Sequence, residues 1–211
     1  MTPSDAAPSP SSSSLTPANQ PGRRPVTSRA QISAIAIDLF TARGFEETSV
    51  DDVAEAVGIG RRTLFRYYPS KNAIAWGDFD AHLTEMRTLL AEIPPTEPIA
   101  DALRRALISF NHVPPSELPG HRRRMSLLLG VPALQAHSML MYAEWRQVIA
   151  EFCAHRLGLR DTDHVPQTIA WMCLGIALAA YEQWLAEPGA DLENLIVTGS
   201  RTLAGGVGAL S

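Results

Sequence analysis

The stretch from Ser49 to Lys71 reads SVDDVAEAVGIGRRTLFRYYPSK, and it decides the fold of the N-terminal part of this chain. Its first half carries apolar residues at the i, i+3, i+4, i+7 spacing of one helical face, namely Val50, Val53, Ala54 and Val57. Ser49 can cap that helix by accepting a backbone amide of the first turn. Gly58 and Gly60 can end it, because glycine adopts the left-handed backbone values of a tight interhelical turn. The pattern predicts the first helix of a helix-turn-helix.

A second, short helix is expected directly after Gly60. Leu64 and Tyr68 are one turn apart and would face inward, which leaves a polar outer face made of Arg61, Arg62, Thr63, Arg66 and Tyr67. Guanidinium groups, a hydroxyl and an aromatic ring suit phosphate oxygens and base edges in the major groove of DNA. A solvated surface would explain the same residue types on an arbitrary helix. The glycine-bounded turn and the amphipathic helix before it favour the DNA interface.

Three blocks of sequence around this segment form an ordered motif. They are Ile35-Ala36-x-x-Leu39-Phe40-x-x-x-Gly44-Phe45, Thr48-Ser49-Val50-x-x-Val53-Ala54 and Gly58-Ile59-x-x-x-Thr63-Leu64-Phe65-x-Tyr67-Tyr68-x-x-Lys71. The motif resembles the DNA-binding domain of the TetR family of bacterial regulators. The resemblance implies that Lys71 binds a backbone phosphate. It also marks a departure, since Phe65 replaces the tyrosine of many relatives and would lie against a thymine methyl or a sugar.

The complete interface that we expect therefore has two parts. Arg62, Thr63 and Tyr67 would contact the groove, and Arg61, Arg66 and Lys71 would mainly hold phosphates, with Phe65 beside them. The helix before this segment is expected over residues 28–43, ended by Gly44. The domain core would centre on Phe40, Phe45, Val53 and Leu64.

The chain divides into four parts by composition and periodicity. Residues 1–27 are rich in Ser and Pro and predict a disordered tail. Within it, Arg23 and Arg24 belong either to a simple flexible tail or to an arm that reaches the minor groove. Residues 28–73 would form the DNA-binding domain, residues 74–205 a helical effector-binding and dimerisation domain, and residues 206–211 a flexible C-terminus.

One long helix is expected to connect the two domains. Ser70 would cap it, and Pro94 and Pro95 would stop it near Glu92. At the standard rise it would span roughly 30 Å. Movement of its far end would then swing the DNA-contacting helices.

The remaining chain predicts an all-α fold. Further helices are expected over about 99–112, 118–130, 132–157, 165–187 and 192–203, with prolines near their boundaries. The helix over 165–187 is apolar on most sides, which fits either core packing or a dimer interface. We favour a homodimer in which it pairs with the helix over 192–203 in a four-helix bundle. A dimer places two recognition helices one turn of DNA apart.

A narrower resemblance lies in Phe65-Arg66-Tyr67-Tyr68-Pro69-Ser70-Lys71-Asn72-Ala73-Ile74, in Trp76-Gly77-Asp78-Phe79-Asp80 and in Val131-Pro132-Ala133-Leu134. These segments are similar to the regulators associated with mycofactocin, a peptide-derived redox cofactor of actinobacteria. The resemblance implies a long-chain acyl-coenzyme A as effector. It also implies control of mycofactocin genes.

A basic run, His121-Arg122-Arg123-Arg124, precedes the apolar residues 125–129. Cations beside an apolar interior suit an acyl chain that carries phosphates, although solvated charges at a helix start would give the same sequence. The expected effector-binding residues are Arg122, Arg123, Arg124, Leu127, Trp145 and Trp171. The wider lining would add Leu89, Phe110, Leu140 and Phe152.

Charge and motif content exclude several other classes. The net charge of −4 is uneven: residues 1–71 hold eight Lys/Arg and seven Asp/Glu, and residues 72–211 hold ten and fifteen. This favours local, specific DNA contact over general phosphate binding. Cys153 and Cys173 fit no zinc or redox spacing and predict buried thiols. The histidine spacing predicts no metal site, and no catalytic or cofactor-binding motif is present. Neither a signal core nor a run of eighteen apolar residues occurs, so we expect a cytoplasmic protein without a membrane partner.

These observations favour a dimeric repressor that binds a palindromic operator and is released by a small apolar effector. The alternative is a helical ligand carrier or enzyme that binds no operator. Substitution of Arg62 or Tyr67 distinguishes the two hypotheses, because only the first needs their side chains.

Overall fold

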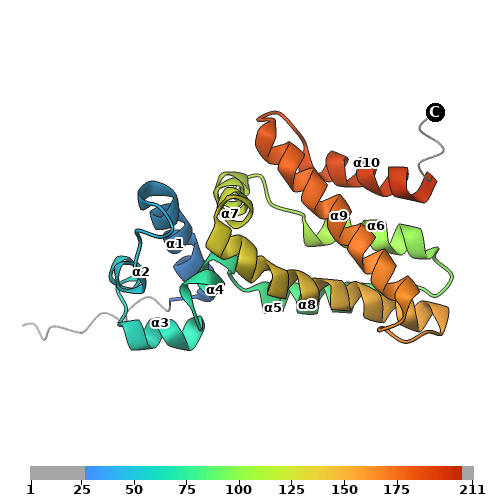
Figure 1. The fold of residues 1–211 in the computed structure, drawn as a ribbon, viewed down its shortest axis with the longest axis horizontal. Coiled ribbons are helices and arrows are strands. Elements are labelled where there is room, and N and C mark those ends of the chain that lie inside the picture. The colour runs from blue at the N-terminus through green and yellow to red at the C-terminus, as the bar shows by residue number, and fades with distance from the viewer. Residues whose placement is uncertain (1–26, 206–211) are drawn as a thin grey trace, which may run out of the picture.

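A computed structural model describes residues 27–205, which form ten α-helices and no strand (Figure 1). The helices are α1 (Arg29–Arg43), α2 (Val50–Val57), α3 (Arg61–Tyr67), α4 (Lys71–Trp76), α5 (Phe79–Glu92), α6 (Ile99–Phe110), α7 (Leu118–Gly130), α8 (Pro132–Leu157), α9 (His164–Ala186) and α10 (Leu192–Gly205). The all-α prediction is confirmed. The predictions for residues 1–26 and 206–211 lie outside the described residues.

Helices α1 to α4 gather at one end of an elongated molecule (Figure 1). Ser28 caps α1 and Ser49 caps α2, each by accepting a backbone amide three residues on. Gly58 ends α2 in the left-handed conformation, with φ of 74°. The predicted core residues are all buried: Phe40, Phe45, Val53 and Leu64. The rings of Phe40 and Phe45 meet edge to face, with their centroids 4.9 Å apart.

The prediction of one continuous helix from Lys71 to Glu92 is wrong. The chain breaks at Gly77, where φ is 74° and ψ is −147°, a conformation that residues with a Cβ rarely adopt. A Cβ at Gly77 would lie 2.9 Å from Nη1 of Arg124 and 3.4 Å from Oγ of Ser33. The close approach of α1 and α7 therefore leaves no room for a side chain at the break. Hydrophobic periodicity along the chain carries no information about it.

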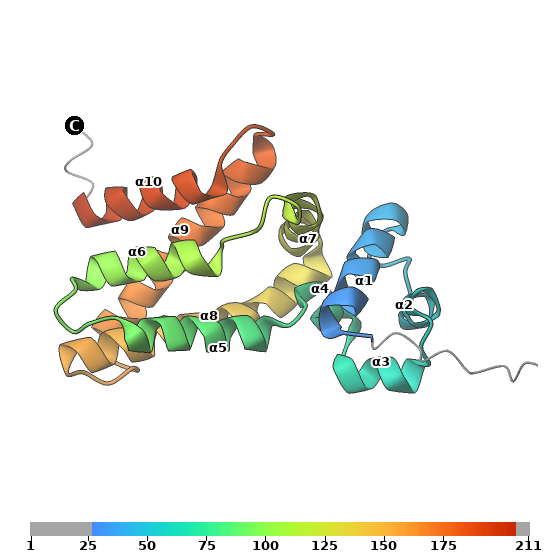
Figure 2. The same ribbon diagram turned by 180° about the vertical axis from the view of Figure 1, so that it is seen from behind.

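Helices α5 to α10 form the larger end of the molecule. The long helix α8 packs against both α5 and α9, and α10 covers α9 and α6 (Figures 1 and 2). All five helices predicted here are observed within two residues of the expected ends. Helix α7 packs against α1 and α4 on one side and α8 and α9 on the other. It therefore connects the two ends of the molecule.

Helix α9 is apolar around most of its circumference and only partly covered. Its exposed side chains include Val165, Trp171 and Met172 at 49%, 50% and 39% exposure. Within residues 27–205, α9 is the one helix that is long and apolar enough to cross a membrane by length and composition. A core helix of a soluble protein meets the same test, and α9 packs between α8 and α10.

Candidate functional site

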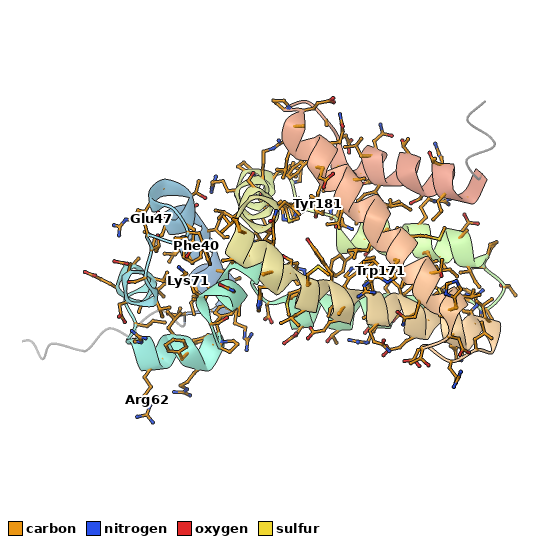
Figure 3. All side chains as sticks on the ribbon, viewed as in Figure 1. Phe40, Glu47, Arg62, Lys71, Trp171 and Tyr181 are labelled. Carbon is orange, nitrogen blue, oxygen red and sulfur yellow. The ribbon has the colours of Figure 1, made fainter. Side chains whose placement is uncertain are left out.

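Helix α3 presents one free face to solvent. Leu64 and Tyr68 hold it from beneath, with exposures of 0% and 2%, and the Tyr68 hydroxyl donates a 2.8 Å hydrogen bond to the Arg29 carbonyl. The side chains expected to contact DNA lie on the other side: Arg61, Arg62, Phe65 and Arg66 are exposed, and Thr63 and Tyr67 are half-buried. Figure 3 shows Arg62 extending from α3 away from the rest of the protein. This face brings cations, a hydroxyl and aromatic rings within one short helix.

Arg61 is paired in this conformation. Its Nη1 lies 2.7 Å from Oδ2 of Asp51, and its guanidinium carbon is 5.5 Å from the Phe65 ring centroid. Both charged groups are exposed, so the ion pair contributes only about 0 to 1 kcal/mol and can be exchanged for a phosphate. Phe65 is 40% exposed. Its ring is available for an apolar contact.

Lys71 has a structural role that the sequence did not indicate. Its Nζ donates to the carbonyl oxygens of Phe45 and Thr48 at 2.7 and 3.2 Å and lies 4.2 Å from the Phe45 ring centroid. The ammonium therefore ties the start of α4 to the loop between α1 and α2. One of its three N–H donors is left for the phosphate contact that the resemblance implies. Sequence spacing does not predict such bonds, because every residue has a backbone carbonyl and only the fold decides which carbonyls lie near Lys71.

A second candidate site is a cavity of about 130 Å³ inside the larger end of the molecule. Its walls come from α4 to α9 and are mostly apolar, and they include six aromatic side chains: Trp76, Phe79, Phe110, Tyr142, Trp145 and Tyr181. The rings of Trp76 and Phe79, and those of Phe110 and Trp145, meet edge to face. Among the residues that the structure describes, no acidic side chain lines the cavity. Such a lining suits the apolar part of a ligand.

Arg124 brings a positive charge to this cavity. Its Nη2 donates a 3.0 Å hydrogen bond to Oγ of Ser33, and Ser33 in turn donates a 2.7 Å bond to the Ile74 carbonyl. Burial lowers the pKa of Arg124 below its usual value, and the group stays cationic because arginine does not deprotonate in proteins. Among the described residues, no carboxylate forms an ion pair with it.

His121 is neutral and largely buried at the same cavity. Its Nε2 lies 2.9 Å from the Tyr181 hydroxyl. Desolvation, and to a lesser degree the nearby Arg124 and His82, lowers the pKa of His121 to about 4. Burial raises the pKa of Tyr181, so both partners are uncharged near neutral pH.

This depressed pKa predicts a loss of stability in acid. An unfolded histidine titrates near 6.5, so the stability that neutral His121 contributes to the folded state is fully present above that pH. This stability declines as the pH falls toward 4, where His121 becomes protonated in the folded state as well. Between pH 7 and 4.5 the free energy of unfolding should fall by roughly 2 to 3 kcal/mol through this residue. Urea titrations at fixed protein concentration should show that extra decline in the wild type and not in His121→Gln. Equal declines in both proteins would refute it.

The structure places two of the six expected effector residues, Arg124 and Trp145, at the cavity, and Phe110 from the wider lining joins them. The other four lie outside the lining of this cavity. The Arg122 guanidinium lies 4.2 Å from the centroid of the Trp184 ring, and Arg123 forms a 2.8 Å ion pair with Asp38. Leu127 packs elsewhere against the core. Trp171 is half exposed, and the Arg146 guanidinium lies against its ring. Leu89, Leu140 and Phe152 do not line the cavity either. Successive residues on α7 point in different directions, which the charge run alone does not show.

The sequence analysis missed several cavity residues that come from other helices: Trp76, Phe79, Tyr142 and Tyr181. Their apolar spacing was visible, but it did not separate cavity walls from filled core. Among the described residues, no group of three or more His, Cys, Asp or Glu side chains could hold a metal ion. Cys153 and Cys173 are free and buried, and desolvation raises the pKa of each thiol, which makes them unreactive.

Known protein families match both the N-terminal and the C-terminal part of the chain. Residues 32–75 match the family described as bacterial regulatory proteins, tetR family, and residues 97–208 match the MftR C-terminal domain. The chain is 54% identical over 171 residues to a protein of Mycobacterium tuberculosis named as a mycofactocin biosynthesis transcriptional regulator, MftR, covering 81% of this chain and 86% of that protein.

Two solved structures have the same fold. The first is Thermus thermophilus FadR, a TetR family repressor in complex with lauroyl-CoA, with a TM-score of 0.55 and 24% identity over 84% of this chain and 93% of that one. The second is Bacillus subtilis FadR in complex with stearoyl-CoA, with a TM-score of 0.59 and 14% identity over 83% of this chain and 97% of that one. At these identities the likeness shows the fold.

Proposed function

The chain belongs to the TetR family of bacterial transcriptional regulators and carries an MftR-type C-terminal domain, and from that premise we propose a repressor that binds a palindromic operator as a homodimer. The observation that supports this proposal is the free face of α3. Buried Leu64 and Tyr68 fix its orientation, and the exposed Arg62 and Arg66 lie on its outer side. In a helix-turn-helix, such a face enters the major groove. Its place of action would be the cytoplasm.

The proposed dimer uses α9 and α10. Val165, Trp171 and Met172 on α9 and Leu203 on α10 expose between 38% and 50% of their surface in the single chain. An apolar surface of this kind is typical of an interface between subunits. Two-fold symmetry would then present two copies of α3 to successive turns of the operator.

We propose a long-chain acyl-coenzyme A as the effector and mycofactocin genes as the regulated targets, on the basis of the resemblance and of the aromatic cavity. The cavity volume of about 130 Å³ is below the roughly 300 to 1,000 Å³ of typical ligand pockets. A long chain must therefore open the domain as it enters. An effector shifts a conformational equilibrium only by binding one state more tightly, so the open state would be the one that does not fit the operator.

Fluorescence anisotropy tests this function directly. A labelled duplex from the DNA beside the protein's own gene is titrated at fixed salt, with and without oleoyl-coenzyme A. We expect sequence-selective binding that oleoyl-coenzyme A reverses and free coenzyme A does not. Selective binding that oleoyl-coenzyme A leaves unchanged would retain the regulator and refute the effector. No selective binding on any neighbouring promoter would favour the carrier.

A further inference from the structure

The cavity contains more hydrogen-bond donors than acceptors. A guanidinium has five N–H groups, and for Arg124 the structure records one hydrogen bond, to Ser33. The indole Nε1 atoms of Trp76 and Trp145 are buried and have no hydrogen-bond partner within residues 27–205. All three residues line the same cavity, which has no carboxylate in its wall. The two buried indole donors need partners and the Arg124 guanidinium has N–H groups to spare, so the cavity is suited to a ligand that supplies acceptor oxygens beside an apolar chain.

The single partner of Arg124 belongs to the DNA-binding end of the molecule. Ser33 lies on α1 and is completely buried, and its own hydroxyl proton goes to the carbonyl of Ile74 in α4. Arg124 also packs on the bare backbone of Gly77, at the break between α4 and α5. These contacts join the cavity to α1 and α4, the two helices that flank the helix-turn-helix in the chain. Lys71, at the start of α4, continues the connection to the loop before α2.

We propose that Arg124 has two alternative partners: Ser33 in the operator-binding state, and in the released state an acceptor oxygen of the effector, at the junction of its head group and its acyl chain. This inference rests on the proposed function, because it identifies how that effector is recognised. A carboxylate or thioester oxygen in the cavity competes with Ser33 for the guanidinium. Withdrawal of Arg124 then removes its hydrogen bond to Ser33 and its contact at Gly77, which loosens the packing of α7 on α1 and α4. Binding of the effector and binding of the operator oppose each other through this one side chain.

Two substitutions should act in opposite directions. Arg124→Gln removes the charge-assisted bond to the effector, and its affinity for the effector should fall by about 10- to 100-fold. Ser33→Ala removes the competing partner, so affinity for the effector should rise by about 2- to 10-fold while operator affinity falls by a similar factor. A merely structural contact predicts that both substitutions impair both activities. Arg105→Gln, at an exposed arginine of α6 that does not line the cavity, should change effector affinity less than about twofold.

The experiment titrates the full-length protein with oleoyl-coenzyme A, oleate and free coenzyme A, and follows the intrinsic fluorescence of its four tryptophans, of which Trp76 and Trp145 line the cavity. The same variants are then tested for operator binding by anisotropy, and circular dichroism checks that each is folded. Opposite shifts for Arg124→Gln and Ser33→Ala, with whichever acyl compound binds, would support the proposal. Shifts in the same direction, or no shift for Arg124→Gln, would overturn it.

Two further outcomes separate this inference from its premises. If free coenzyme A binds the wild type and loses affinity in Arg124→Gln, the residue recognises phosphates and the proposed orientation of the ligand is wrong. If the wild type binds an acyl compound through Arg124 but binds no operator, the proposed function fails and the assignment of the head group stands. Arg124→Lys keeps the charge without the planar fork, and it should retain part of the affinity that Arg124→Gln loses.

Discussion

Replacement of Arg62 by alanine is expected to weaken operator binding by roughly 1 to 3 kcal/mol per subunit, because a guanidinium can donate two parallel hydrogen bonds to a guanine edge. A symmetric dimer uses the side chain twice, so the loss on a palindrome should approach double that value. Arg62 extends into solvent (Figure 3) and forms no ion pair with any of the described residues. Its removal should therefore leave the free energy of unfolding within about 0.5 kcal/mol of the wild type.

Anisotropy titrations on the operator and on a scrambled duplex measure this effect. A loss confined to the operator would identify Arg62 as a base contact, whereas an equal loss on both duplexes would identify a phosphate contact. Arg87→Ala is the matched control, since it removes an exposed arginine from α5 at the other end of the molecule. Unchanged operator binding by Arg62→Ala would refute the proposed interface and favour the alternative of a carrier.

Truncation of Phe40 to alanine should abolish operator binding because it destabilises the core that supports the helix-turn-helix. The side chain is 1% exposed and packs edge to face on Phe45 at the centre of the small core around α1 to α3. Removing a buried phenylalanine costs about 3 to 5 kcal/mol, which a core of this size cannot absorb. The helix-turn-helix should unfold at a lower temperature than the rest of the molecule. The cavity between α4 and α9 should still bind the effector.

Circular dichroism melts, operator titrations and indole fluorescence report these three properties in one preparation. Phe40→Leu keeps most of the buried volume and should cost less than about 1.5 kcal/mol, with operator binding retained at 25 °C. Leu140→Ala is the surface control, because Leu140 is 61% exposed and its truncation should change stability by less than about 0.5 kcal/mol. A Phe40→Ala protein that binds the operator as tightly as the wild type would show that this core does not support α3.

Signals in the sequence are sufficient to predict the helix-turn-helix. Its signals are local: Ser49 caps α2 three residues from its partner amide, Gly58 ends the helix, and Leu64 and Tyr68 anchor α3 one turn apart. The helices from α6 to α10 were likewise predicted within two residues of their observed ends, because prolines lie near their boundaries. Local rules of this kind depend on residues a few positions apart. They can therefore be read without knowing how the helices pack.

Tertiary structure decided the features that join residues far apart in the chain. At the Gly77 break, Arg124 and Ser33 occupy the space that a side chain would need, and they lie 47 and 44 positions away in sequence. The carbonyls that hold Lys71 lie 26 and 23 residues before it. The run of three arginines could not show that only Arg124 faces the cavity, since the direction of a side chain matters only once a neighbouring helix is in place. Burial, and with it the low pKa of His121, is likewise a property of the assembled helices.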